Sequence, residues 1–182
     1  MSRPMLMIIL WVVCAIIGLV ALLMLGFWIR GRAIPVEHQA SSTVDLPVTA
    51  EEVFALLDDV QAQPSWNKSV NRVDMLPDRS GMQACRMKMG RNSFVLVRTR
   101  REPPHVLERT ISDDHGPFSG TWLYTLTPSP AGCRLKLTET GRVTNSVARA
   151  MMKHLFGYHM YINAHLKALG KKFGHEVTPH KA

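Results

Sequence analysis

The chain has 182 residues, of which 46% are hydrophobic, and a formal net charge of +8. It contains no internal repeat and no low-complexity tract, which excludes solenoid and fibrous architectures. Three cysteines are too few for a disulfide framework, so Cys85 and Cys133 are either one pair or two thiols. The positive balance favours contact with anionic surfaces such as lipid headgroups.

The N-terminus is strongly apolar. Residues 4–29 carry no charged side chain. At a rise of about 1.5 Å per residue, a helix of this length exceeds the hydrocarbon core of a bilayer, which is roughly 30 Å thick. Trp28, Arg30 and Arg32 follow at its end, where an indole ring and cations suit the headgroup region. Residues 1–32 are therefore predicted to form an uncleaved transmembrane anchor with these three residues facing the membrane surface.

Two alternatives to the anchor remain open. A cleaved secretory signal has an apolar region of only about 7 to 15 residues followed by small residues, and this run is longer. A buried helix of a soluble fold is the other alternative. The orientation is nearly balanced, because Arg3 at one end faces Arg30 and Arg32 at the other. We expect a single-pass membrane protein with its soluble domain in the cytoplasm.

After the anchor, residues 33–39 read as an extended linker around Pro35, and one domain is expected over residues 40–175. Alternating residues predict a first strand over 42–46. Thr49 and Glu52 form a capping box that predicts a short amphipathic helix ending near Asp58. The polar stretch 61–67 reads as a bent connector carrying Trp66.

Six further strands are predicted from alternating apolar residues, over 70–76, 82–89, 93–101, 106–113, 118–127 and 132–143. Their short connections favour an antiparallel meander. Asn145 is expected to cap one continuous helix of nearly eight turns that reaches Phe173, followed by a flexible tail over 176–182. Its apolar stripe comprises Ala148, Met151, Met152, Leu155, His159, Ile162, Leu166, Leu169 and Phe173. Burying this stripe and one sheet face requires an α+β fold in which the sheet wraps around the helix.

Several short segments carry a resemblance to a known family. They are Val44–Val48 with Ala50–Phe54, Pro64–Trp66, Gly120–Trp122 with Tyr124 and Leu126–Pro128, and Leu137–Gly141. In this order they resemble the START-like helix-grip superfamily (SRPBCC), specifically the polyketide cyclase/dehydrase and lipid transport family. The resemblance implies a curved antiparallel sheet that grips a long C-terminal helix around a cavity for a hydrophobic ligand. The N-terminal anchor lies outside the family pattern.

The strand over 132–143 places Glu139 in line with the apolar residues Cys133, Leu135 and Leu137. A carboxylate in such a row is costly unless it is paired or solvated. It is either a polar group at the mouth of a cavity or a structural carboxylate bonded to backbone or arginine. Glu139, Tyr124 and the helix residue His159 are candidate proton-transfer groups if the domain is an enzyme.

Residues that would line the ligand cavity are mostly aromatic, aliphatic or methionine side chains, which equally suit a plain core. The set is Trp66, Trp122, Tyr124, Leu137, Glu139, Met151, Met152 and Leu155. His154, His159 and His165 are spaced five and six apart, so they predict no metal site. No cofactor motif is found.

One hairpin is strongly basic: it contains Arg86, Lys88, Arg91, Arg98, Arg100 and Arg101 and no acidic residue. Arg86 with Lys88, and Arg98 with Arg100, are each predicted on one strand face. This surface would suit anionic lipid or simply be solvated, and the anchor argues against nucleic acid as a partner. No feature predicts an oligomeric state.

Three hypotheses for function follow from the sequence. The first is membrane-tethered binding or transport of a hydrophobic small molecule, such as a lipid, quinone or polyketide-like compound, with the lipid bilayer as a partner. The second is a cyclase- or dehydrase-like enzyme that uses the same cavity. The third is a protein-interaction module that uses the basic sheet face.

Overall fold

The computed structural model describes residues 3–111, 118–130 and 132–182. The chain divides into two compact units. The first comprises the N-terminal residues up to Val36 together with Val143–Phe156. The second comprises Glu37–Arg142 and Gly157–Ala182. The segment 143–156, predicted as part of the soluble domain, thus belongs to the unit that contains the N-terminal helix.

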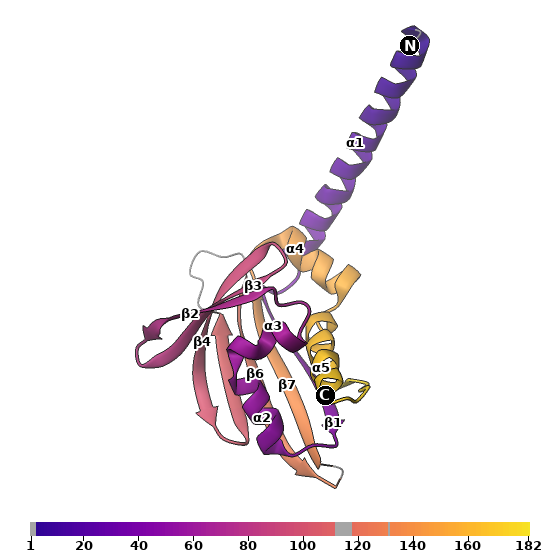
Figure 1. Ribbon diagram of the computed structural model, residues 1–182. Coiled ribbons are helices and arrows are strands. Elements are labelled where there is room, and N and C mark those ends of the chain that lie inside the picture. The colour runs from indigo at the N-terminus through magenta and orange to yellow at the C-terminus, as the bar shows by residue number, and fades with distance from the viewer. Residues whose placement is uncertain (1–2, 112–117, 131) are drawn as a thin grey trace. The chain divides into compact units, whose positions relative to one another are not determined.

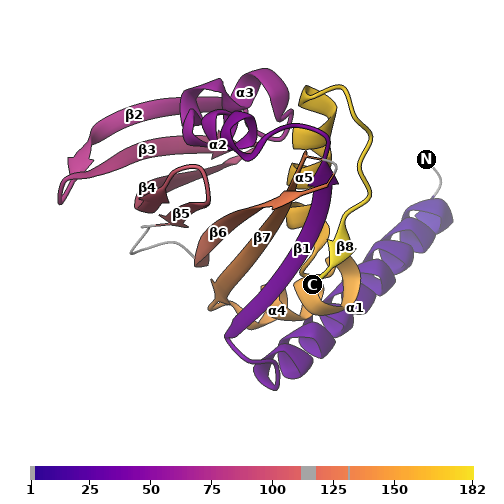
Figure 2. The ribbon, with the colours of Figure 1, turned by 90° about the horizontal axis from the view of Figure 1, so that it is seen from below.

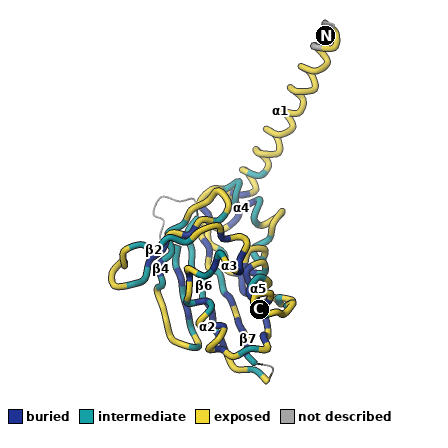
Figure 3. Tube along the Cα trace, viewed as in Figure 1, coloured by how far each residue is buried: buried dark blue, intermediate teal, exposed yellow. Residues whose placement is uncertain are grey.

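The first unit is built on α1 (Arg3–Arg32). Within it, Met7–Arg32 is long and apolar enough to cross a membrane, and it is the one such helix among the described residues. Most of its described residues are exposed, as the yellow part of the tube in Figure 3 shows. The unit also holds α4 (Ser146–Met151) and a π-helical turn, η2 (Met152–Phe156).

The second unit contains a curved sheet of eight strands in the order β2-β3-β4-β5-β6-β7-β1-β8. Their bounds are β1 Glu37–Leu46, β2 Arg72–Arg79, β3 Met82–Met89, β4 Asn92–Glu102, β5 Val106–Ile111, β6 Phe118–Ser129, β7 Gly132–Val143 and β8 His180–Lys181. The pairs are antiparallel, with β1 lying along β7 from Glu37↔Arg142 to Leu46↔Cys133. Figure 2 shows the sheet curving around one side of α5.

Three helices and one turn accompany this sheet: α2 (Ala50–Asp58), η1 (Val60–Ala62), α3 (Gln63–Trp66) and α5 (Met160–Lys172). The capping box predicted for α2 is present, because the amide nitrogen of Glu52 lies 3.2 Å from Thr49 Oγ1, and that of Thr49 lies 2.9 Å from Glu52 Oε2. Such reciprocal bonds satisfy two amides that a helix start leaves free. The connector predicted over 61–67 is helical up to Trp66, in η1 and α3.

The main core lies between the sheet, α2 and α5 (Figures 1 and 2). Its fully buried members include Leu46, Val53, Leu107, Leu126, Leu135, Leu137, Ile162, Leu166 and Leu169. Strand alternation supplies the sheet members, since every second residue of β7 from Cys133 to Leu137 is buried. The α+β helix-grip architecture predicted from the sequence is therefore confirmed.

The single helix predicted from Asn145 to Phe173 is interrupted. Asn145 does cap a helix, accepting the Ala148 amide at 2.9 Å, but α4 ends at Met151. A π-helical turn follows, and Gly157 adopts a φ of 75°, a value that only glycine adopts without strain. The π-helical turn and the left-handed conformation of Gly157 end the regular helix. The apolar stripe is therefore divided between the two units.

The C-terminal tail is also more ordered than the sequence predicts. Residues 180–181 form β8, which pairs with β1 at Ser42↔Lys181 and Thr43↔His180. Val177 packs against the main core and lies over Gly170, where a Cβ would approach its methyl carbons at 2.7 Å. Two residues of the segment predicted as a flexible tail thus pair with the open edge of β1, and Val177 contacts the core.

Strand positions agree closely with the alternation pattern, and the bounds of β3 and β7 match the prediction. β1 begins at Glu37, inside the segment predicted as a linker. β5 is described to Ile111, and the last two residues of the predicted strand, at 112–113, lie outside the described residues. Cys85 and Cys133 are two buried free thiols rather than a pair.

Candidate functional site

Polar side chains lie inside the main core, and His165 of α5 is at their centre. His165 is 4% exposed, and its Nε2 lies 3.2 Å from the hydroxyl of Tyr124 on β6. Its other ring nitrogen, Nδ1, lies 3.2 Å from Asn67 Nδ2. Trp66 and Trp122 approach the same imidazole edge-on, with ring centroids at 5.3 and 5.0 Å. These five residues form the interior polar cluster.

Burial sets the protonation of this cluster. It lowers the pKa of His165 from 6.5 to about 4, with a further contribution from the positive charge of Arg109. Burial also raises the pKa of Tyr124 far above its usual value. Both groups are therefore neutral at pH 7, because the charged form of each would be desolvated.

The hydrogen-bond directions follow from Asn67. Its Oδ1 accepts the Ser69 amide at 3.1 Å, which turns its Nδ2 toward His165 as a donor. Nδ1 of the neutral imidazole must then accept, so Nε2 carries the ring proton and donates it to the Tyr124 oxygen. The hydroxyl hydrogen of Tyr124 is left over, and this arrangement leaves it available to another acceptor.

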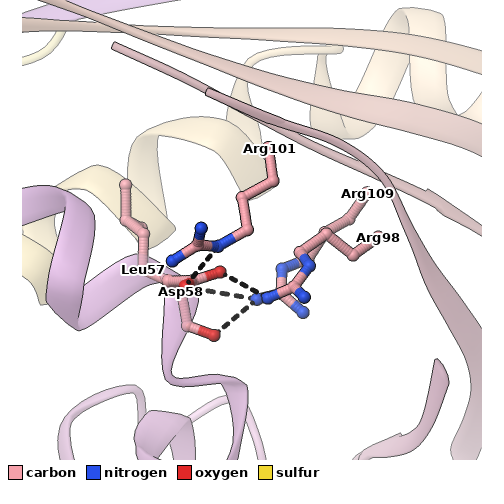
Figure 4. Close-up of polar contacts among 5 residues, drawn as sticks. All are labelled: Leu57, Asp58, Arg98, Arg101 and Arg109. Carbon is pink, nitrogen blue, oxygen red and sulfur yellow. Dashed lines mark hydrogen bonds and ion pairs between the residues drawn. The ribbon is translucent and has the colours of Figure 1, made fainter. Parts of the chain in front are cut away.

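Arg109 of β5 adds a buried cation near this cluster. It is 5% exposed, and it lies beside Trp122 as its cross-strand neighbour. Its Nη2 donates to the carbonyl oxygens of Leu57 at 3.1 Å and Asp58 at 3.0 Å (Figure 4). These carbonyls end α2, where a helix leaves acceptors free and carries partial negative charge. The Nε of Arg109 has no hydrogen-bond partner among the described residues.

Two further arginines meet the side chain of Asp58, as Figure 4 shows. Arg98 Nη1 lies 2.8 Å from Oδ1, and Arg101 Nε lies 2.9 Å from Oδ2. Burial opposes ionisation of Asp58, but hydrogen bonds from Arg101 and Arg98 outweigh it and hold the pKa of that carboxyl below its usual value. The two ion pairs join the end of α2 to β4.

The prediction that Arg98 and Arg100 share one basic face is wrong. Arg98 and Arg100 were expected on the same side of one strand, but the register of β4 against β5 shifts between them. This bulge inserts a residue and breaks the alternation. Arg98 therefore reaches the half-buried Asp58, whereas Arg100 is exposed and pairs with Glu102 at 2.8 Å. Arg86 and Lys88 do lie outward together on β3.

An open cleft of about 500 Å³ lies between α2 and β4. It is lined by Glu51, Phe54, Ala55, Asp58, Asp59, Gln83, Arg98, Arg101, Pro103 and Pro104. None of the residues predicted to line a ligand cavity belongs to this set. Of those in the second unit, Trp66, Tyr124 and Leu137 lie in the main core and Trp122 packs against it, whereas Glu139 bonds to Trp122.

Glu139 is half-buried and has two neighbours. Its Oε2 accepts the indole hydrogen of Trp122 at 2.9 Å, and its Oε1 lies 3.4 Å from His38 Nε2. The latter contact lacks hydrogen-bond geometry. The imidazole of His38 stacks on Tyr158 with centroids at 4.2 Å and crosses Gly141, where a Cβ would overlap it. The partners of Glu139 are thus an indole and an imidazole, rather than the backbone or arginine considered from sequence.

His159 bonds to β1 through Ser42. Buried Ser42 donates its hydroxyl to Asn163 Oδ1 at 2.8 Å, so its oxygen must accept from His159 Nδ1 at 3.1 Å. These bonds fasten α5 to β1. The three candidate proton-transfer residues, Glu139, Tyr124 and His159, consequently have different partners and form no single group.

Three predicted lining residues lie in the other unit. Met151 ends α4, Met152 begins the π-helical turn, and Leu155 is exposed there. Among the described residues, no group of three His, Cys, Asp or Glu side chains is arranged to hold a metal ion.

Arg109 and His165 were missed as functional candidates. A signal for Arg109 is present, because Leu107 and Arg109 are two apart on one strand and therefore share the face that packs in the core. His165 lies three residues after Ile162 and four before Leu169, so it shares the apolar face of the helix.

Removing the Asp58 carboxylate should destabilise the fold. In Asp58→Asn the amide loses both charge-assisted bonds, and the expected decrease in the free energy of unfolding is about 1 to 2 kcal/mol after discounting for solvent screening. Chemical denaturation of the full chain in detergent measures it. Glu102→Gln is the matched control, since the pair with Arg100 is exposed and should give no measurable change. Equal losses in both variants would contradict a special role for Asp58.

The comparisons with known proteins agree with this fold. A family model described as polyketide cyclase / dehydrase and lipid transport matches residues 37–170. No curated protein gives a match. Among solved structures, the Zhui aromatase/cyclase from Streptomyces sp. R1128 has a TM-score of 0.63 and 18% identity, over 75% of this chain and 93% of its own.

Two other structures are similar. A START superfamily protein from Mycobacterium smegmatis has a TM-score of 0.59 and 18% identity, over 74% of this chain and 96% of its own. The di-domain aromatase/cyclase BexL from the BE-7585A biosynthetic pathway has a TM-score of 0.62 and 17% identity, over 75% of this chain. This chain spans only 50% of BexL. These likenesses concern the fold, whereas the match over residues 37–170 shows that the chain belongs to the polyketide cyclase/dehydrase and lipid transport family.

Proposed function

We propose that this protein binds a hydrophobic small molecule between its sheet and α5, and that α1 tethers it to a membrane with the domain in the cytoplasm. The ligand is lipid-, quinone- or polyketide-like, in keeping with the family. Membership of a family that includes lipid transport supports binding, and the length and apolar surface of α1 support the tether.

The observation that carries the proposal is a set of spare hydrogen-bond donors in the core. The Nε of Arg109 and the Nε1 of Trp66 have no partner among the described residues, and Tyr124 has a spare hydroxyl hydrogen. Unpaired buried donors cost free energy, and so does a buried cation without a bonded carboxylate. An interior selected for stability alone would replace them, so we infer that they serve an acceptor on a ligand.

The donors define the ligand chemistry. A largely apolar molecule that carries a carbonyl or carboxylate oxygen would accept from Arg109 and Tyr124 while its remainder replaces contacts among the interior aromatic rings. The half-buried Trp122, Glu139 and His38 contact one another in a row that ends at the buried Tyr124, and we infer that the ligand enters on this side. Side chains of the main core must move aside as the ligand binds.

Binding is favoured over catalysis by the protonation states. A general base works best with a pKa near the operating pH, and a histidine at about 4 is too weak a base for that role. A cyclase- or dehydrase-like reaction is the second candidate. Its support is the Tyr124 hydroxyl, which would polarise a ligand carbonyl as a hydrogen-bond donor.

The test is to identify what the full chain carries. Protein purified from its membrane in mild detergent should release a lipid-soluble compound detectable by mass spectrometry, and the apo form should bind members of a lipid and quinone panel. Arg109→Met should weaken binding by about 10-fold or more, the effect of losing a bond to a charged donor. Tyr124→Phe should weaken it less.

Matched controls separate binding from folding. Arg100→Met and Tyr161→Phe change exposed residues of the same unit and should leave affinity unchanged. The proposal fails if no compound is carried and none of the panel binds. It also fails if Arg109→Met binds as well as the unaltered chain, since the spare donor would then have no ligand role.

A further inference from the structure

The π-helical turn of the first unit exposes two large apolar side chains in succession. Leu155 is 59% exposed and Phe156 is 49% exposed. Lys153 and His154 precede them and are exposed as well. Single exposed apolar residues are common, but an adjacent Leu–Phe pair beside a cation is typical of segments that lie in a membrane interface.

The helix α4, which directly precedes this turn, is held to the end of α1. Gly31 approaches Ser146 so closely that a Cβ at position 31 would overlap the Ser146 carbonyl. The guanidinium of Arg149, 8% exposed, donates from Nε to the Gly31 carbonyl at 3.1 Å and from Nη1 to the Val143 carbonyl at 2.9 Å. The start of α4 therefore has a fixed position beside the last turn of α1.

The C-terminal end of α1 carries residue types that are common at a membrane–water interface. Arg32 lies over the ring of Trp28 at 4.7 Å, and Arg30 is exposed between them. Indole rings and cations concentrate at headgroup depth. Since α4 starts against Gly31, the segment from Ser146 to Phe156 begins at the same depth, and its ten helical rises extend from there by at most about 15 Å.

We propose that the segment from Ser146 to Phe156 is a second membrane contact, which lies in the headgroup region with Leu155 and Phe156 inserted and Lys153 facing anionic lipid. The proposal rests on the proposed anchoring by α1. The segment adds a peripheral contact to the anchor. The surface that it contacts is a bilayer that contains anionic phospholipid. The charge of Lys153 and the continuity with α1 favour this surface over a protein partner.

Fluorophores attached to single cysteines test the depth of each segment. The full chain is reconstituted in vesicles of phosphatidylcholine and phosphatidylglycerol that contain spin-labelled lipids, with the spin label in the headgroup or deep in the acyl chain. Bimane on native Cys14 reports α1, because Cys85 and Cys133 are buried. In a Cys14→Ala background, bimane on His154→Cys reports the turn, and bimane on Lys136→Cys, an exposed position of β7, is the water-facing control.

The expected result is deep quenching at position 14, shallow quenching at 154 and none at 136. Leu155→Gln with Phe156→Gln should reduce the quenching at 154 to the level at 136, while that at 14 stays unchanged. An unquenched label at 154 beside a quenched one at 14 overturns this inference alone. Unchanged quenching at 154 in the double variant also overturns it, because the apolar pair would then not insert. An unquenched label at 14 removes the anchor itself.

Discussion

The free energy of unfolding is expected to fall by about 3 kcal/mol between pH 7 and pH 4 through His165 alone. The pKa of this residue is 6.5 unperturbed and about 4 in the fold, where burial comes first among the causes and the charge of Arg109 second. Above pH 6.5, His165 is neutral in both the folded and the unfolded chain, so its contribution to the free energy of unfolding is fully retained. Below 6.5 the unfolded chain takes up a proton that the folded chain does not, so stability is lost until the pH reaches about 4.

Chemical denaturation of the full chain in detergent, at a series of pH values and followed by tryptophan fluorescence, measures this loss. Other carboxyl groups titrate in the same range, so His165→Gln is needed as the reference. Glutamine keeps a polar group that can bond Tyr124 but takes up no proton. The separation between the two curves should change between about pH 6.5 and pH 4 and stay constant above and below that range. Curves that are parallel throughout would mean that His165 is solvated in the fold.

Leu166→Ala is expected to destabilise the second unit by about 3 kcal/mol, within the range for a buried leucine. Leu166 is fully buried on α5, in the same core cluster as Trp66, Tyr124 and Leu137. The loss combines the transfer of apolar carbon atoms into the core with the hole left behind. This substitution therefore tests how tightly the sheet grips α5.

Tyr161→Ala on the same helix is the control, because Tyr161 is 51% exposed. Its effect should stay within about 0.5 kcal/mol. The helix propensity changes in the same direction in both variants, so their difference isolates core packing. A loss in Leu166→Ala no larger than in Tyr161→Ala would contradict the described core.

Much of the fold could be predicted because its determinants are local. The Thr49–Glu52 capping box specifies the start of α2 within four residues. Strict alternation from Cys133 to Leu137 marks which face of β7 is buried. The order of strands with short connections then leaves few topologies besides an antiparallel sheet around a helix.

The interruption of the C-terminal helix could not be predicted from periodicity. Apolar residues recur at helical spacing on both sides of Gly157, and a single glycine inside such a pattern is often tolerated. Its positive φ depends on how the flanking segments pack. The segment before Gly157 belongs to the unit that contains α1, whereas the apolar residues of α5 pack in the core beneath the sheet.

The candidate site was predictable only in part. Trp122 and Tyr124 lie on the inner face of β6, as strand parity predicts, and Trp66 of α3 packs in the same core. Arg109 was not, because a charged residue in an alternating strand is usually assigned to solvent. What makes its burial possible is the end of α2, whose free carbonyls accept its hydrogens from a segment about 50 residues earlier.

By itself, the sequence determined the elements, the sheet-and-helix class and the apolar N-terminal segment, because caps, alternation and hydrophobic length act between near neighbours. Only the tertiary structure decided which polar groups share a site. The pairing of Tyr124 with His165 and of Arg109 with α2 joins residues 41 and about 50 positions apart. Such contacts depend on register, on the bulge beside Arg98 and on the burial that sets each pKa, none of which is encoded in a local pattern.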